Sequence, residues 1–182
     1  MSRKVDLSQY NKAGYRPGCN ALVRGLWYVT NMLFFKTAWC PCYGWKRVLL
    51  RTFGAHVGSR VVIKPGVNIK YPWHLTIGDN SWIGENVWID NLADVRIGQN
   101  CCISQGAMLL CGNHDYKKAG FDLLTGEIVL KDGAWVGAKA VVCPGVTMGA
   151  GSVLTVGSVA TKDIEEDGMY QGNPAVLKKK IQ

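Results

Sequence analysis

The chain has 182 residues, a formal net charge of +8 and seven cysteines. This length is enough for one compact domain that buries its own core without disulfide or metal cross-links. The cysteines form an odd set without metal-site spacing, and residues 1–20 lack the apolar run of a secretory signal peptide. We therefore expect reduced thiols and a cytoplasmic protein.

The excess positive charge lies ahead of residue 57. Residues 1–56 contain nine Lys or Arg but only one acidic residue, Asp6, whereas the rest of the chain contains equal numbers of each sign. Hydrophobic patterns predict helices over 21–35 and 44–53; the first is too short to cross a bilayer and is interrupted by Arg24 and Asn31.

Two roles remain open for this basic, aromatic segment. It can cap the open end of the structure that follows, or it can lie as a peripheral anchor in the interface of a membrane with anionic lipids. Nucleic-acid binding is not expected, because no recognisable module accompanies the charge.

From residue 57 to residue 162 an aliphatic residue recurs every six positions, usually followed by Gly. Neither helical spacing nor strand alternation gives a period of six, whereas a β-helix with one short strand and one corner per hexad does. The predicted inward positions are Val57, Ile63, Ile69, Ile77, Ile83, Ile89, Ile97, Ile103, Leu109, Leu130, Val136, Val142, Met148, Leu154 and Ala160.

Breaks in this period predict where the β-helix is interrupted. The gaps from 69 to 77 and from 89 to 97 are eight residues, which indicates a two-residue insertion at the same corner of two coils. The gap from Leu109 to Leu130 predicts a long loop over residues 111–129, the kind of element that carries functional sites on repeat scaffolds. The predicted organisation is a helical segment 1–56, a β-helix 57–163 and a tail 164–182.

The candidate catalytic residue is His114, at the point where the chain leaves the coil for the long loop. An imidazole beside a concave surface is a general base suited to neutral pH, although a solvated loop histidine remains the alternative. A histidine-ligated metal site, as in carbonic anhydrases of β-helical architecture, is not expected, because the three histidines His56, His74 and His114 are 18 and 40 residues apart.

Eight short motifs resemble the hexapeptide-repeat O-acetyltransferases, in particular exopolysaccharide acetyltransferases of the colanic acid type. These motifs are DLS (6–8), LLRTFG (49–54), YPW (71–73), GNHDY (112–116), GAWVGA (133–138), PGVT (144–147), SVATKD (158–163) and GNP (172–174). They cover nearly the full length of the chain, so the resemblance does not rest on the hexads alone.

The resemblance implies a left-handed parallel β-helix that assembles as a homotrimer, with active sites between subunits. It implies that His114 takes the proton of a sugar hydroxyl as this hydroxyl attacks the thioester of acetyl-CoA. The implied acetyl-CoA-binding residues are Trp135, Ala138, Val156, Thr161, Lys162 and Lys179. At Ala138 only a backbone amide is available to stabilise the oxyanion.

The acceptor site is the least defined part of the expectation. Candidates for contacts with sugar hydroxyls are Asn86, Asp90, Asn91, Asp94 and Asp115. Asp115 or Glu127 can alternatively orient the imidazole. A sugar of exopolysaccharide assembly or a lipid-linked oligosaccharide is the expected acceptor; another small hydroxyl acceptor (free sugar, antibiotic or serine) and a non-catalytic trimeric scaffold are the alternatives. We expect no metal and no further cofactor.

Overall fold

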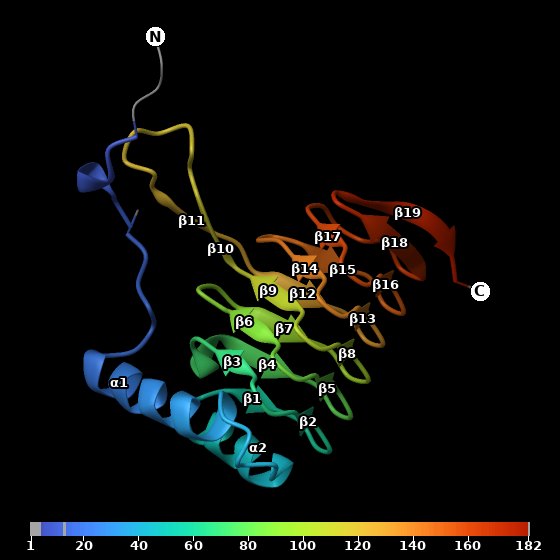
Figure 1. Cartoon of the computed structure of the whole chain (residues 1–182), viewed down its shortest axis with the longest axis horizontal. Helices are drawn as coiled ribbons and strands as arrows, with labels where there is room; N and C mark the ends of the chain where they lie inside the picture. Colours follow the sequence, from blue (N-terminus) through green and yellow to red (C-terminus); the bar gives the residue numbers. More distant parts are fainter. Residues whose placement is uncertain (1–4, 13, 182) are drawn as a thin grey trace.

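The computed structural model describes residues 5–12 and 14–181. The hexads form a parallel β-helix, as predicted, in which successive coils stack and each coil contributes a short strand to each of three sheets (Figure 1). The first sheet consists of β1 (His56–Val57), β4 (Leu75–Ile77), β7 (Val95–Ile97), β12 (Ile128–Leu130) and β15 (Thr147–Met148).

The other two sheets follow the same order of coils. The second sheet consists of β2 (Val62–Ile63), β5 (Trp82–Ile83), β8 (Cys102–Ile103), β13 (Trp135–Val136), β16 (Val153–Leu154), β18 (Gly168–Gly172) and β19 (Ala175–Lys180). The third sheet consists of β3 (Asn68–Ile69), β6 (Trp88–Asp90), β9 (Met108–Leu110), β14 (Val141–Val142) and β17 (Val159–Ala160).

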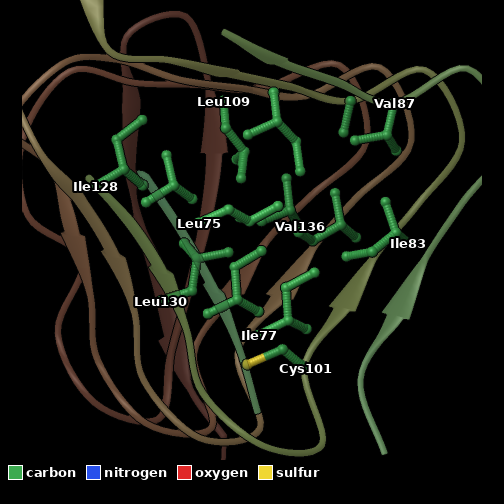
Figure 2. Packing of buried hydrophobic residues seen from close by; sticks show 14 of the residues in the cluster. Leu75, Ile77, Ile83, Val87, Cys101, Leu109, Ile128, Leu130 and Val136 are labelled. Carbon is green, nitrogen blue, oxygen red and sulfur yellow. The ribbon is translucent and has the colours of Figure 1, made fainter. Parts of the chain in front are cut away.

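The core is a stack of aliphatic side chains inside the coils (Figure 2). Along the first sheet Val57 pairs with Ile77, Ile77 with Ile97, Ile97 with Leu130 and Leu130 with Met148. All the predicted inward positions are at most 8% exposed. Because burying one such side chain stabilises a fold by about 1.5–3 kcal/mol, the repeated positions supply much of the driving force for folding.

Tight corners explain the small residues of the hexad. A Cβ atom at Gly137 would lie 2.6 Å from the backbone nitrogen of Val156 in the next coil, so the spacing between coils requires Gly there. At two of the three corners Asn80, Asn86 and Asn100 have φ angles of 59°, 58° and 55°, in the left-handed region that Asn tolerates better than most residues.

The two predicted insertions lie at one corner, between the third and first sheets. The first includes the short 3-10 helix η3 (Pro72–His74), and side-chain hydrogen bonds join it to the second. The Tyr71 N–H donates to Asn91 Oδ1 at 2.9 Å, and His74 Nδ1 lies 2.8 Å from Asp94 Oδ1. The insertions therefore support one another.

The predicted loop 111–129 leaves from this corner as an antiparallel hairpin. It contains β10 (Gly112–His114) and β11 (Leu123–Thr125), and it projects from the body of the β-helix (Figure 1). The N-terminal arm, residues 5–12, lies along this hairpin: the Asp6 N–H donates to the Ala119 carbonyl at 3.0 Å, and the Leu123 N–H donates to the Asn11 carbonyl at 3.1 Å. The sequence did not predict this arm, which includes the 3-10 helix η1 (Leu7–Gln9).

Residues 20–52 cap the first coil. The predicted first helix is α1 (Ala21–Thr30), extended by a π-helical turn, η2 (Asn31–Phe35). The predicted second helix is α2 (Tyr43–Thr52). In Figure 1 these helices lie against the end of the β-helix that starts with β1 and β2. No helix in the described part of the chain is long and apolar enough to cross a membrane.

Basic side chains of the cap donate hydrogen bonds to backbone carbonyls of the first coil, which has no preceding coil to pair with. Arg51 donates to the Val57 carbonyl at 2.7 and 2.9 Å, and Arg47 donates to the Val61 carbonyl at 2.8 Å. The fully buried Lys46 donates to the carbonyls of Ile63 and Lys64, at 3.3 and 3.2 Å, and burial lowers its pKa. Unpaired sheet edges are unfavourable, so these cations stabilise the open end.

The segment predicted as a tail forms regular structure instead. Strands β18 and β19 pair antiparallel, and β18 continues the second sheet beside β16. Lys180 at the end of β19 forms an ion pair with Glu165, at 2.7 Å. The hairpin therefore covers one edge of the last coil, at the end of the β-helix opposite the cap (Figure 1).

Candidate active site

His114 lies at the end of β10, where the side chain is held by the tip of its own hairpin. Its Nδ1 atom is 2.9 Å from the carbonyl oxygen of Phe121, and the two rings stack with centroids 4.5 Å apart. The Tyr10 ring approaches from the N-terminal arm, 5.8 Å from the imidazole centroid. Because a carbonyl only accepts, Nδ1 must carry the proton, and Nε2 is the nitrogen that can act as a base.

In this structure the Phe121 carbonyl, and neither of the candidate carboxylates Asp115 and Glu127, bonds to the imidazole. The Asp115 carboxylate instead accepts from the Lys117 N–H at 2.9 Å and does not line the cavity beside His114. Glu127 Oε2 lies 3.6 Å from Arg96 Nη2, so this carboxylate pairs with an arginine. Phe121 has a φ angle of 53°, an unusual conformation for a bulky residue, in the turn that brings its carbonyl to His114.

A cavity of about 600 Å³ adjoins His114. The N-terminal segment supplies Tyr10, Lys12, Tyr15, Pro17 and Arg24, and the β-helix and its hairpin supply Lys70, Tyr71, Asp90, Leu92, Gly112, His114 and Leu123. Its volume and mixed lining are those of a small-molecule site. We call it the histidine cavity.

A second cavity, of about 380 Å³, lies beside the first and is more apolar. Four residues line both cavities: Arg24, Lys70, Tyr71 and Asp90. Its remaining lining is Trp27, Tyr28, Asn31, Met32, Lys36, Asn68, Ile69 and Trp88. We call it the helix cavity, because α1 and η2 form one of its walls.

The predicted acceptor residues have different positions in the structure. Asp90 lines both cavities and pairs with Lys70 at 2.9 Å, so its placement fits a contact with the acceptor. Asn91 is fully buried and its amide bonds to the Tyr71 backbone, so its role in this chain is structural. Asp94 is bound to His74, which lowers the Asp94 pKa. Asn86 lies at a different corner, between the second and third sheets.

Cys111 is the cysteine nearest to His114 in the sequence. It is completely buried, and burial raises the pKa of its thiol to about 12. The thiolate is the reactive form of cysteine, so this residue is not a nucleophile at neutral pH. The arrangement therefore favours direct attack by a second substrate, activated by His114, over a cysteine-bound intermediate.

The comparisons with known proteins find acetyltransferases. The chain is 39% identical over 175 residues to WcaF of Escherichia coli K12, which carries the provisional name of a colanic acid biosynthesis acetyltransferase; the match covers 94% of both chains. It is 31% identical over 137 residues to the galactoside O-acetyltransferase of the same organism, covering 73% of this chain and 67% of the relative. No family model matches. The chain belongs to the hexapeptide-repeat acetyltransferases.

Solved structures confirm the predicted fold of this acetyltransferase, the left-handed β-helix of the hexapeptide-repeat proteins. A galactoside acetyltransferase in complex with coenzyme A superposes with a TM-score of 0.79 at 26% identity, covering 92% of this chain and 86% of the other. The hexapeptide-repeat acetyltransferase VCA0836 of Vibrio cholerae, in complex with acetyl coenzyme A, superposes with a TM-score of 0.82 at 24% identity over the full length of both chains.

The predicted cofactor residues of the acetyltransferase lie on the surface of the β-helix, and none lines either cavity. Trp135 is half exposed on the second sheet, where its indole N–H donates to Ser104 Oγ at 2.9 Å. Ala138 and Val156 occupy the same corner of successive coils, and the Gly157 N–H donates to the Ala138 carbonyl at 2.9 Å.

The remaining three predicted cofactor residues are also exposed. Thr161 and Lys162 follow the last strand of the third sheet, at the same corner of the β-helix from which the His114 hairpin leaves in an earlier coil. Lys179 lies on β19. One protomer therefore presents these residues on its outer faces without gathering them around His114. Among the described residues, no group of three or more His, Cys, Asp or Glu is placed to hold a metal ion.

Sequence reasoning missed several residues of the two cavities. In the sequence Arg24 only interrupts an apolar helix, and Tyr10 and Tyr15 belong to none of the motifs. The signal for Arg24 was present, because a cation on a short apolar helix that cannot span a membrane needs an aqueous or anionic partner. Tyr10 and Tyr15 lie in a segment without periodicity, so nothing in the sequence placed them beside His114.

Proposed function

We propose that this acetyltransferase transfers the acetyl group of acetyl-CoA to a sugar hydroxyl in exopolysaccharide assembly, with His114 as general base. The observation that carries the proposal is the bond from His114 Nδ1 to the Phe121 carbonyl, which leaves Nε2 as the proton acceptor beside a cavity of about 600 Å³. The names of the two Escherichia coli relatives support both the polysaccharide pathway and a sugar acceptor.

The chemistry follows from the weak nucleophilicity of an un-ionised hydroxyl group. A sugar hydroxyl is a poor nucleophile at neutral pH, so Nε2 of His114 removes its proton as the oxygen attacks the thioester carbonyl carbon. The new C–O bond gives a tetrahedral oxyanion, for which the backbone N–H of Ala138 is the proposed donor. When the C–S bond breaks, the imidazolium returns the proton to the departing thiolate of CoA. Holding both substrates together removes much of the entropic barrier.

The acetyl-CoA site is proposed to lie between two subunits of a homotrimer. The corner that carries Ala138 and Val156 is exposed, and Val156 is 69% exposed in one protomer. A second protomer that packs against this corner would bring a His114 hairpin to it, in keeping with the heterologous contacts of a cyclic trimer. Trp135, Thr161, Lys162 and Lys179 would then contact the cofactor, the lysines through its phosphates.

We also propose that the enzyme works in the cytoplasm at the inner face of the membrane. The described cysteines are all free, which fits a reducing compartment. The cap exposes the apolar side chains of Leu22, Leu26, Val29, Leu33, Trp39, Trp45 and Val48. We call this set the apolar cap face; the excess positive charge of residues 1–56 favours anionic headgroups.

The decisive experiment is a thiol-release assay with acetyl-CoA and a panel of sugars and glycolipids, run on wild type and His114→Ala. Loss of acceptor-stimulated turnover by about a hundredfold or more, with CoA binding and oligomeric state retained, is the expected result. Equal turnover in both proteins would exclude His114 as the base. If wild type turns over only free sugars, an antibiotic or serine, the acceptor is one of the alternative small hydroxyl compounds. If it binds no CoA, the scaffold alternative holds.

A further inference from the structure

The two cavities are neighbours that share part of their walls, because Arg24, Lys70, Tyr71 and Asp90 line both. We treat them together as one groove that leads from His114 towards the cap. The histidine cavity holds the catalytic base, whereas the helix cavity is lined more by apolar surface, including Tyr28, Met32 and Trp88. A sugar alone does not need the second part, so the groove fits an acceptor with an apolar end.

The junction carries positive charge that the protein leaves unbalanced. Asp90 is the sole carboxylate in the lining of the two cavities, and it pairs with Lys70. Arg24 has no ion-pair partner within residues 5–12 and 14–181; its guanidinium makes a long contact, 3.4 Å, with the Cys19 carbonyl. Lys12 adds a further cation on the histidine side and Lys36 on the helix side. A guanidinium without an ion-pair partner favours binding of an anion that accepts two hydrogen bonds, such as phosphate.

A buried hydroxyl also lines the histidine cavity. The Tyr15 hydroxyl makes no geometrically defined hydrogen bond with another described residue, and Tyr71 is the side chain near enough to interact with it. Burial and the nearby Asp90 raise the Tyr15 pKa, so the group stays protonated and can donate. Leaving such a group unpaired is unfavourable, and a hydrogen bond to a ligand oxygen would relieve this cost.

The order of residues around α1 and η2 connects this groove to the apolar cap face. Trp27, Asn31 and Phe35 recur at every fourth position and pack into the cap. One position further along, Arg24, Tyr28, Met32 and Lys36 recur with the same spacing and line the helix cavity. Leu22, Leu26, Val29 and Leu33 form the next stripe, which is exposed. The helix cavity therefore lies directly beside the surface that we propose to contact the membrane.

We propose that the groove binds a lipid-linked sugar: the sugar lies in the histidine cavity, the linking phosphate or diphosphate is bound by Arg24 with the Tyr15 hydroxyl, and the first apolar units of the lipid lie against Tyr28, Met32 and Trp88. This inference rests on the proposed function, because it names the class of acceptor. The ligand that fits this groove has an anionic group between a sugar and an apolar chain. A glycan attached to a lipid phosphate has this chemistry.

The test is a binding measurement that requires no acetyl transfer. Farnesyl diphosphate, in monomeric solution, is titrated into the CoA-saturated full-length protein and followed by calorimetry, with inorganic diphosphate, farnesol and UDP-glucose as separate arms. We expect farnesyl diphosphate to bind at least tenfold more tightly than each of the others. Arg24→Gln should weaken this binding at least tenfold, whereas Arg16→Gln, an exposed cation in the same segment outside the groove, should leave it unchanged.

A second pair of variants separates the groove from the membrane surface. Tyr28→Ser combined with Met32→Ser should weaken farnesyl diphosphate binding, whereas Leu22→Ser combined with Leu26→Ser should not, because these leucines do not line the groove. Binding that is indifferent to Arg24→Gln, or tighter binding of UDP-glucose, would overturn the lipid-phosphate assignment. Neither result would affect CoA binding or the His114 dependence of turnover, so failure here is distinguishable from failure of the proposed function.

Discussion

The carbonyl oxygen of Phe121 lies 2.9 Å from Nδ1 of His114, seven positions earlier in the chain. A backbone carbonyl cannot be protonated near neutral pH, so it fixes one tautomer of the imidazole over the whole physiological range. A carboxylate in the same place would in addition put a negative charge beside the imidazole. The proposed base therefore has a fixed orientation without a charged partner.

The Phe121 ring should act on the reaction through the position of His114. Phe121→Ala keeps the carbonyl but removes the stacked ring, so we expect kcat to fall about tenfold because the imidazole is less well oriented. The KM for acetyl-CoA should not change. Steady-state kinetics would separate the effect on kcat from the effect on KM. Phe121→Tyr, which keeps an aromatic ring, should restore kcat. Tyr116 is an exposed aromatic residue in the same hairpin, so Tyr116→Ala should behave as wild type. A fall confined to KM would contradict this role.

The active site should form between two subunits. His114→Ala and Val156→Trp are each expected to be inactive, the second because an indole at the exposed corner blocks the acetyl-CoA channel. When the two variants are unfolded and refolded together, mixed trimers that pair an intact hairpin with an intact corner should regain activity. Thiol release before and after mixing measures this. If mixing restores nothing although sedimentation shows mixed trimers, the two residues serve the same subunit's site.

The apolar cap face should hold the enzyme on anionic membranes. We expect wild type to float with vesicles that contain anionic phospholipid and to dissociate at high salt, because screening weakens the electrostatic part of the attraction. Leu22→Ser combined with Leu26→Ser should lose flotation while keeping acetyl transfer to a soluble sugar. Equal flotation of this variant and wild type would show that the face does not mediate the contact.

The basic side chains of the cap should contribute to stability through hydrogen bonds. Arg51→Ala removes three contacts with the carbonyls of Val57 and Gly58, so we expect the free energy of unfolding to fall by about 2 kcal/mol. Chemical denaturation of this variant can be compared with Arg60→Ala, which removes a single bond to Asn80 at an exposed corner. Similar losses in both variants would argue against edge capping.

The link between Asp94 and His74 should make stability depend on pH in acid. The hydrogen bond from His74 lowers the Asp94 pKa below its ordinary value of 3.8, so the folded state binds this proton less readily than the unfolded state. The stabilisation is therefore present above about pH 4 and lost as the pH falls through the lower, folded pKa. The Tm difference between wild type and Asp94→Asn should shrink over this range. In a His74→Ala background the Asp94→Asn change should have much less effect.

The sequence predicted the β-helix well because one residue type repeats at one spacing. Ile77, Ile97 and Leu130 occupy the inward positions that the period assigned to them, even across the long loop. The eight-residue gaps also placed the two insertions at one corner correctly. Each of these inferences depends on local spacing, which the geometry of the coil converts directly into position.

The site was less predictable because its parts come from contacts that leave no pattern. Any residue offers a carbonyl, so the role of Phe121 depends on a turn that the sequence does not reveal. The burial of Asn91 follows from a pairing with Tyr71 across two insertions. Tyr10 reaches His114 only because residues 5–12 lie along the hairpin. The expected cofactor residues stay apart in one protomer, so their assignment remains a prediction.

The long hairpin leaves the β-helix at a corner, and Ile97 pairs with Leu130 as though no residues intervened. Residues of this hairpin can therefore be inserted, deleted or exchanged without disturbing the packing of the coils from which it leaves. An exchange of the hairpin would change the site while the framework stays constant. The unit of exchange, however, must include the arm: the Asp6 N–H and the Asn11 carbonyl bond to the backbone of Ala119 and Leu123, so a transplanted hairpin needs an arm beside it.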